Sequence, residues 1–332
     1  MYKPFPSFVN ALAGKRVLVT GGAGFIGSNL AEALLEIGAV VTVLDDLSTG
    51  LQSNVDRLSH QENYTFVRGN ITNPEDYKEI LKQVDLISHQ AALGSVPRSI
   101  ALPLNTHHVN ATGFLTILHE AKEAGVKRFV YASSSSVYGD SLMSPKVEGG
   151  EGNMLSPYAV TKQLNEEYAQ VYHRLHQMEC VGLRYFNVFG PYQNPEGVYA
   201  AAIPRFLDKM LTGGEIVVNG DGNQTRDFTF VRNAVLANLA SLSTANPNAF
   251  GKVYNVACGA SCTLNNVIEA LHNGLVKLKV EPQHSLIYGP ERSGDIRDSL
   301  ANISAIETEL GYKALYSFEE GIDTYLDFQL NK

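Results

Sequence analysis

Short apolar runs alternate with longer segments of helical periodicity along the first half of the chain. A short apolar run bounded by turn residues predicts a buried strand, and apolar residues at every third or fourth position predict a helix. The predicted strands are residues 17–20, 40–44, 64–67, 84–87, 129–132 and 181–183. The predicted helices are residues 25–37, 74–82, 113–124 and 157–176. This alternation predicts an α/β fold, a doubly wound parallel sheet with helices on both of its faces.

The alternation ends near residue 189, where prolines and glycine-rich polar stretches interrupt it. We therefore expect residues 1–188 to form a sheet domain, to which the chain returns near residues 228–260. Residues 189–332 should mainly form a smaller, less regular region. Because open parallel sheets bind ligands beyond the carboxyl ends of their strands, we expect this region to close over that edge.

A glycine-rich segment joins the first predicted strand to the first predicted helix, where residues 20–27 read TGGAGFIG. Glycines allow a tight turn whose backbone N–H groups approach a pyrophosphate at the positive end of the helix dipole. Asp45 ends the second predicted strand, where a carboxylate can accept hydrogen bonds from the adenosine ribose hydroxyls. No Arg or Lys follows in residues 46–50, so a 2′-phosphate would meet acids and NAD is favoured over NADP. The alternative is an ordinary glycine-rich turn.

A second candidate feature is the pair Tyr158 and Lys162, which lies on a helix predicted to begin at Ser156 and Pro157. A spacing of four residues places both side chains on one helical face. A phenol with an ordinary pKa of ~10 is a poor base at neutral pH, and a nearby ammonium group would lower that pKa. The serines of residues 133–136 add hydroxyls at the carboxyl end of a predicted strand. The alternatives are a chance spacing on a helix and a polar exit from a strand.

These residues together resemble the extended short-chain dehydrogenase/reductase family, and within it the UDP-hexose 4-epimerase branch. The resemblance covers nearly the whole chain and implies a Rossmann domain with a smaller C-terminal substrate-binding domain. The segment AALGSVPRS at residues 91–99 resembles bacterial UDP-N-acetylglucosamine/UDP-N-acetylgalactosamine 4-epimerases. Other matching segments are the glycine loop, the serine run, Tyr158/Lys162, and residues 45, 90–92, 110, 184–190, 226–227 and 292–295.

The resemblance implies an enzyme with NAD as its cofactor and a UDP-sugar as its substrate. It implies three catalytic residues, which are Tyr158, Lys162 and Ser134. The residues implied for NAD are Gly21, Gly24, Phe25, Ile26, Gly27, Asp45, Asp46, Ser48, Thr49, Gly50, Asn70, Ile71, Gln90, Ala91, Ala92, Asn110, Tyr158, Lys162, Tyr185 and Val188. Those implied for the UDP-sugar are Gly94, Ser95, Ser133, Ser134, Ser135, Tyr158, Asn187, Gln193, Ala201, Val218, Arg226, Arg292, Asp295 and Ser299.

One position departs from the pattern of this family. Asn70 stands where these proteins usually have an aspartate that faces the adenine amino group. An asparagine can still accept through its carbonyl oxygen. We therefore expect modestly altered NAD contacts and no change of cofactor.

The implied reaction is 4-epimerisation of a UDP-N-acetylhexosamine through a 4-keto intermediate, which would supply precursors of surface polysaccharides. Tyr158 would take the proton of the 4-hydroxyl while the C4 hydride passes to NAD, Ser134 would hydrogen-bond O4, and Lys162 would bind the ribose. Three alternatives stay open. They are epimerisation of the corresponding uronic acid with Arg98 as its candidate donor, a 4,6-dehydratase, and an NAD-binding module without turnover. The dehydratase is disfavoured because hydroxyls occupy the position of its acids, and the inactive module because both Tyr158 and Lys162 are present.

Ser299 bears on the size of the sugar pocket. In the resembled family, the position seven residues after the Arg of Arg-x-Gly-Asp governs whether an N-acetyl group fits at C2. Counting from Arg292 gives Ser299, whose small side chain would leave room for that group. The alternative is a plain surface serine.

The overall composition narrows the classes of partner. Of the 332 residues, 44% are hydrophobic and 18% charged, which is typical of a folded chain. The formal charge of −8 argues against a general nucleic-acid binder. The sequence shows no signal-like apolar run at its start and no membrane-length apolar stretch, and its three cysteines suggest neither a disulfide framework nor a metal site. We expect a cytoplasmic protein without membrane or metal partners, and the resemblance implies a homodimer.

Overall fold

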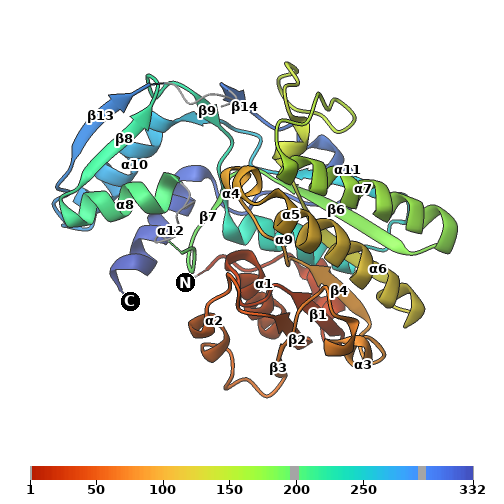
Figure 1. The fold of residues 1–332 in the computed structure, drawn as a ribbon. Coiled ribbons are helices and arrows are strands. Elements are labelled where there is room, and N and C mark those ends of the chain that lie inside the picture. Colours follow the sequence, from red (N-terminus) through yellow and green to blue (C-terminus); the bar gives the residue numbers. More distant parts are fainter. Residues whose placement is uncertain (1, 195–201, 291–296, 332) are drawn as a thin grey trace.

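A seven-stranded parallel sheet forms the centre of the molecule (Figure 1). The computed structural model describes residues 2–194, 202–290 and 297–331. The strand order is β11-β6-β5-β4-β1-β2-β3, and every neighbouring pair is parallel. The strands are β1 (Arg16–Thr20), β2 (Val40–Asp45), β3 (Tyr64–Arg68), β4 (Leu86–His89), β5 (Arg128–Ser134), β6 (Glu179–Tyr185) and β11 (Lys252–Val256). The predicted doubly wound parallel sheet is confirmed.

Strand β1 is the point at which the strand order reverses. Val17 lies opposite Val41 of β2 on one side and Leu86 of β4 on the other. Residues 17–20 are all fully buried, because helices cover both faces of the sheet and no alternation of apolar and polar residues is needed. A reversal of this kind leaves a crevice at the carboxyl ends of the strands, where ligands of such sheets bind.

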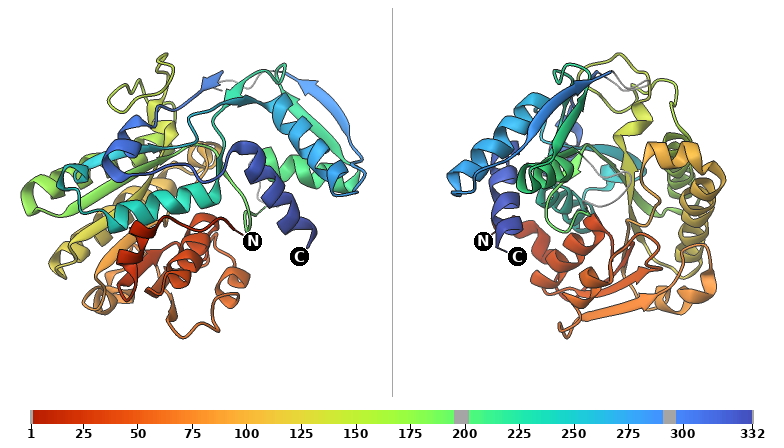
Figure 2. Two further views of the ribbon diagram at one scale, coloured as in Figure 1. Left: turned by 180° about the vertical axis from the view of Figure 1, so that it is seen from behind. Right: turned by 60° about the vertical axis from the view of Figure 1, so that its left-hand side comes forward.

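Helices cover the sheet on both faces (Figure 2). One layer contains α1 (Phe25–Glu36), α9 (Val231–Ser243), α11 (Ser304–Leu310) and the 3₁₀ segment η1 (Ser7–Leu12). The opposite layer contains α3 (Lys78–Leu81), α4 (Val96–Ala101), α5 (Pro103–His107), the π-helical turn η3 (His108–Gly113), α6 (Phe114–Glu123) and α7 (Pro157–His176). Helix α2 (Gln52–Asp56) lies between β2 and β3 in the sequence. Among all helices of the described ranges, none is both long and apolar enough to cross a membrane.

Helix α9 returns the chain from the smaller region to the sheet. Its residues 231–242 are all buried, and it contacts β4, β5, β6 and β11 as well as α1. A helix that is apolar around most of its circumference is stable only inside the protein. Its few polar side chains therefore need hydrogen-bond partners inside the protein. Asn238 donates to the Tyr185 hydroxyl, beside the site described below.

The smaller region gathers helices and short strands at one end of the sheet (Figure 1). Its helices are α8 (Ala202–Thr212), α10 (Leu264–Lys277) and α12 (Phe318–Leu330). Its strand pairs are β8 (Glu215–Asn219) with β13 (Ser285–Gly289), and β7 (Val188–Phe189) with β10 (Thr229–Phe230). A three-stranded sheet has the order β12 (Cys262–Thr263), β9 (Thr225–Arg226) and β14 (Asp298–Ser299). The remaining 3₁₀ segments are η2 (Pro74–Asp76), η4 (Ser135–Tyr138) and η5 (Pro247–Ala249).

Two predicted elements differ from the structure. The helix predicted over residues 74–82 is divided into η2 and α3, because Tyr77 leaves helical geometry and its hydroxyl donates to the Ile71 carbonyl at 3.0 Å. The strand predicted over residues 84–87 begins and ends two residues later. Its polar end is buried because the His89 ring shares a 2.8 Å hydrogen bond with the Thr20 hydroxyl.

Helix α7 begins as its sequence predicts. The Ser156 hydroxyl accepts from the Ala159 N–H at 3.1 Å, and Pro157 occupies the first helical position. We expect Ser156→Ala to lower the free energy of unfolding by about 1 kcal/mol, since the N–H loses its capping acceptor. Denaturant unfolding measures this, with Ser156→Asp as the control that keeps an acceptor. Equal stability of Ser156→Ala and the native protein would contradict the cap.

Candidate active site

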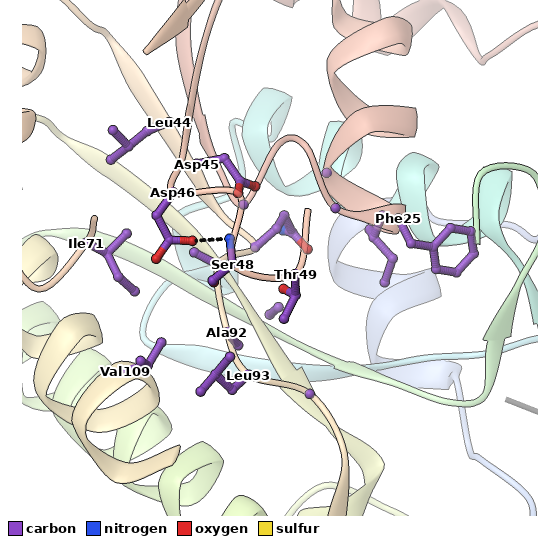
Figure 3. Close-up of a pocket in the computed structure, with 18 of the residues that line it drawn as sticks. Phe25, Leu44, Asp45, Asp46, Ser48, Thr49, Ile71, Ala92, Leu93 and Val109 are labelled. Atoms are coloured by element: carbon purple, nitrogen blue, oxygen red, sulfur yellow. Dashed lines mark hydrogen bonds between the residues drawn. The ribbon is translucent and has the colours of Figure 1, made fainter. Parts of the chain in front are cut away.

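A cavity of about 320 Å³ lies at the carboxyl edge of the sheet, beside the reversal at β1 (Figure 3). Its walls come from the glycine loop, the ends of β2 and β5, the loops after β3 and β4, and helix α7. The predicted residues that line it are Gly21, Gly24, Phe25, Ile26, Gly27, Asp45, Asp46, Ser48, Thr49, Asn70, Ile71, Gln90, Ala91, Ala92, Gly94, Ser133, Tyr158, Lys162 and Tyr185. The lining residues that the sequence did not single out are Leu44, Gly69, Leu93, Val109 and Ala132.

The glycine loop leaves no room for side chains at two of its positions. Gly21 has a φ of +66°, and a Cβ there would lie 2.6 Å from the Ala91 backbone nitrogen. A Cβ on Gly27 would lie 2.2 Å from the Gly21 carbonyl oxygen. The first turn of α1, with Phe25 and Ile26, lines the cavity beside these glycines. This is the arrangement that a pyrophosphate requires at a helix N-terminus.

Two adjacent carboxylates stand at the end of β2. The Asp45 carboxylate accepts from the Ala23 N–H at 3.0 Å and from the Leu47 N–H at 2.8 Å, while burial raises its pKa. Asp46 accepts from the Ser48 N–H at 2.8 Å, the contact dashed in Figure 3. Gly50 does not line the cavity, but a Cβ there would lie 2.8 Å from an Asp45 oxygen. Its lack of a side chain lets the turn close over that carboxylate.

Asn70 is oriented differently from the expectation. Its carbonyl oxygen accepts from both the N–H and the hydroxyl of Thr72, each at 2.9 Å, and its amide nitrogen donates to Asp46 at 3.3 Å. Both lone pairs of that carbonyl oxygen are engaged, so this arrangement does not support its accepting from an adenine amino group. The neighbouring Asp46 carboxylate is the stronger acceptor at this end of the cavity.

The proposed catalytic side chains meet at the end of β5. Burial raises the pKa of the Tyr158 phenol, and the neighbouring Ser134 hydroxyl opposes that rise. The Lys162 ammonium donates to the Ala132 carbonyl at 2.7 Å and lies 5.9 Å from the centre of the Tyr158 ring. Burial lowers the pKa of Lys162 to about 8, against the effect of nearby Glu166.

The lowering of the Tyr158 pKa was expected from Lys162. In the structure the Ser134 hydroxyl is the group that lowers it. The Lys162 ammonium instead donates a hydrogen bond to the Ala132 carbonyl.

Buried amides hold the walls of the cavity in place. Asn110 does not line it, but accepts from the Leu93 N–H at 2.7 Å and donates to the Leu93 carbonyl at 3.1 Å. Gln90 accepts from the Tyr185 hydroxyl at 3.0 Å, and Asn238 of α9 donates to that hydroxyl at 2.7 Å. The sequence interpretation missed Asn238. Its available signal was a polar residue within an otherwise apolar helical run.

A second cavity, of about 290 Å³, lies in the smaller region. The predicted residues among those that line it are Asn187, Val188, Val218 and Arg226. Val188 was predicted to bind the cofactor, but it lines this cavity because it belongs to β7, beyond the end of β6. The lining residues not predicted are Phe189, Ala202, Ile203, Arg205, Phe206, Val217, Asn219, Gln224, Phe228 and Leu264. Most are apolar and carry no motif.

The remaining predicted residues lie near these walls or outside the described chain. Ser135 opens η4 directly after Ser134, and Ser95 caps α4 by accepting from the Arg98 N–H at 3.2 Å. Gln193 donates to the Val188 carbonyl at 3.3 Å. Ser299 is half-buried and pairs with Arg226 in the register of β14 and β9. The residues outside the described ranges are Ala201, Arg292 and Asp295.

Known proteins share this arrangement along nearly their whole length. Residues 17–257 match the NAD dependent epimerase/dehydratase family. The chain is 34% identical over 320 residues to a UDP-glucose 4-epimerase of Mycolicibacterium smegmatis, covering 96% of this chain and 99% of that protein. Among solved structures, it is similar to a UDP-N-acetylglucosamine 4-epimerase from Methanobrevibacter ruminantium, with a TM-score of 0.88 and 36% identity over 96% of this chain and 99% of that one.

A third similar protein is a dTDP-glucose 4,6-dehydratase from Streptomyces venezuelae, whose structure contains NAD. Its TM-score is 0.85 at 31% identity, over 96% of this chain and 97% of that one. Over its whole length, the chain is therefore similar both to epimerases and to a dehydratase. The family match confirms NAD as the cofactor, and the narrower resemblance to N-acetylhexosamine epimerases stays a prediction. With a glycine loop that leaves no room for a Cβ at two positions and with Tyr158 and Lys162 at the cavity wall, the chain belongs to the NAD-dependent epimerase/dehydratase family.

Proposed function

We propose that this protein is a 4-epimerase that interconverts UDP-N-acetylglucosamine and UDP-N-acetylgalactosamine through a 4-keto intermediate. The observation that carries the proposal is the position of Tyr158 and Lys162 at the wall of the cofactor cavity, with the Ser134 hydroxyl acting on the phenol. The similarity to a UDP-N-acetylglucosamine 4-epimerase supports the same substrate class. The product would serve as a precursor of surface polysaccharides.

The first cavity fits NAD. Gly21 and Gly27 leave the backbone open for a pyrophosphate, and Asp45 stands where ribose hydroxyls bind. Bound there, NAD supplies an acceptor that takes a hydride from the sugar and returns it. Tyr185 and Gln90 also line this cavity, and a 3.0 Å hydrogen bond joins them.

The chain's own residues move the proton of the sugar 4-hydroxyl. Tyr158 accepts it as the base and later returns it to O4. Ser134 interacts with the phenol and opposes the effect of burial on its pKa, and the Lys162 ammonium lies 5.9 Å from the centre of the Tyr158 ring on the same helical face. Lys162 is buried, while Tyr158 and Ser134 are half-buried at the edge of the cavity.

The side chains beside Tyr158 favour epimerisation over dehydration. A 4,6-dehydratase must eliminate water across C5 and C6, which needs an acid and a base. Ser134 and Ser135 offer hydroxyls at that position, and hydroxyls are too weakly acidic and basic for this task. Similarity of the whole chain does not make this distinction, so the proposal rests on these two residues.

A homodimer completes the proposal. Helices α6 and α7 pack side by side (Figure 1) and present a groove lined in part by Leu115, Leu164, Tyr168 and Tyr172. We propose that a second copy covers it. Light scattering during size-exclusion chromatography would give twice the monomer mass, and a monomer at micromolar concentration would contradict this.

Proton NMR of the purified protein with one UDP-sugar at a time tests the proposed activity. We expect UDP-N-acetylglucosamine to yield a mixture with UDP-N-acetylgalactosamine, and UDP-glucose and UDP-galactose to react more slowly. Conversion of the corresponding uronic acids alone would favour the acidic alternative. Loss of water to give a 4-keto-6-deoxy sugar would establish a dehydratase, and no reaction with any of these sugars would remove the proposal.

Tyr158→Phe should lower kcat by ~10²–10⁴-fold while leaving UDP-sugar binding nearly unchanged, because the phenol acts in the transition state. Steady-state kinetics and calorimetric binding measure the two effects. Tyr288→Phe is the control, since Tyr288 is exposed on β13 and lines neither the two cavities nor the groove between α6 and α7. A Tyr158→Phe variant that keeps a third of its activity would place the base elsewhere.

Gly27→Ala should reduce the NAD retained through purification. The added Cβ would overlap the Gly21 carbonyl oxygen at 2.2 Å, so the loop must move out of its pyrophosphate-binding form. The adenine absorbance released from denatured protein gives the NAD content. Gly289→Ala is the control, because its Cβ would have its nearest neighbour at 3.7 Å. Equal NAD content in the two variants would contradict the role of this loop.

Ser299→Tyr should selectively remove activity on acetylated UDP-hexosamines. The larger side chain would occupy the space beside Arg226, and overpacking costs ~1–3 kcal/mol, or roughly tenfold to over a hundredfold in selectivity. The ratio of kcat/KM between acetylated and non-acetylated substrates measures it. Ser285→Tyr on exposed β13 is the control. An unchanged ratio in Ser299→Tyr would show that this residue does not face the sugar.

A further inference from the structure

A buried carboxylate lies directly behind the proposed catalytic residues. Glu166 follows Lys162 by four residues on α7, so the two share one helical face. Its carboxylate accepts from the Ser133 hydroxyl at 2.5 Å and from the Arg184 guanidinium at 2.9 and 2.7 Å. Ser133 and Arg184 are partners in the register of β5 and β6. One carboxylate therefore ties the catalytic helix to two neighbouring strands.

This ion pair is enclosed by the protein. The side chain of Arg184 is 4% exposed and that of Glu166 is 10% exposed. Arg184 also forms an ion pair with Glu151 and lies 4.9 Å from the centre of the Tyr138 ring. Buried ion pairs contribute little net stability compared with apolar packing, because desolvation offsets their attraction. Stability alone is thus a weak reason for a second acid on Arg184.

Glu166 also acts on Lys162. Burial lowers the pKa of Lys162 to about 8, and the charge of Glu166 opposes that effect. The other groups facing this ammonium are neutral: the Ala132 carbonyl of β5, the Tyr158 phenol of α7, and His89 of β4, whose pKa burial lowers to about 3. Lys162 itself also lowers the pKa of His89. The negative charge that keeps Lys162 an ammonium at neutral pH is therefore the Glu166 carboxylate.

We infer that Glu166 is a positioning residue for the proposed proton transfer, which holds Lys162 in its charged form and fixes Ser133, and with it Ser134, against Tyr158. This inference rests on the proposed function. It assigns Glu166 two separable effects. The first is electrostatic and depends on pH, and the second is geometric and does not.

Glu166→Gln is the test, and Glu151→Gln is its matched control. Each removes one carboxylate from Arg184, but Glu151 makes no contact with Ser133 and is not among the groups that act on Lys162. Without Glu166, Lys162 should lose its proton at lower pH, so the alkaline limb of the kcat profile moves toward acid. Relative to the native protein, Glu166→Gln should lose on the order of tenfold more kcat on the alkaline side of the profile than on the acid side. This is the effect expected when a neighbouring opposite charge is removed. Glu151→Gln should keep the native profile.

A substrate-free measurement separates this inference from the proposed function. Spectrophotometric titration of the holoenzyme, with Tyr158→Phe as the blank, reports ionisation of the Tyr158 phenol. In Glu166→Gln the phenolate should appear at higher pH, because Ser134, no longer fixed through Ser133, opposes the effect of burial on the phenol less. A native protein that interconverts no sugar would remove the proposed function while leaving this titration valid.

The inference is supported if the alkaline limb of the kcat profile and the phenol titration move in Glu166→Gln only, and if Glu166→Asp restores both. Equal loss in Glu166→Gln and Glu151→Gln at every pH would show a purely structural ion pair and overturn it. If Glu166→Gln does not fold, Ser133→Ala tests the positioning role of Glu166 instead. Removal of that hydroxyl should move the substrate-free titration of the Tyr158 phenol to higher pH, and an unchanged titration would overturn the positioning role.

Discussion

The site depends on how closely the glycine loop approaches the turn after β4. The Gly21 position would place a Cβ only 2.6 Å from the Ala91 nitrogen, and Gly27 would place one 2.2 Å from the Gly21 carbonyl oxygen. These contacts are available because β1 pairs with both β2 and β4 and brings their carboxyl ends together. Asp45, Gln90 and the start of α1 then face one cavity. Every later element of the site is placed relative to this junction.

Helix α7 is the second fixed component. Its side chains at positions 158, 162 and 166 follow one face, and each reaches a different partner on the sheet. Tyr158 contacts Ser134, Lys162 contacts the Ala132 carbonyl, and Glu166 contacts both β5 and β6. Three successive turns of α7 are thus bound to the carboxyl ends of β5 and β6. The acid–base groups keep their geometry because the helix cannot slide along the sheet.

The sequence predicted what is local and missed what depends on register. The glycine loop, Asp45 and the Tyr158–Lys162 spacing are short-range features of a strand–turn–helix or of one helical face, and the parallel sheet followed from apolar runs. The Glu166 carboxylate meets residues 18 and 33 positions away, which only the pairing of β5 with β6 brings together. The lining of the second cavity was also missed, because its apolar residues look like ordinary core. The orientation of Asn70 was not predicted, because its carbonyl oxygen accepts two hydrogen bonds from Thr72.

Helix α9 connects the walls of the two cavities. Phe228 lines the second cavity, and the chain passes through β10 directly into this helix, whose Asn238 holds Tyr185 at the wall of the first. Residues 231–242 are buried along the whole of this path, so the helix has no space in which to bend or unwind. The walls of both cavities therefore depend on the placement of one buried helix. A substitution that displaces α9 should disturb both of them.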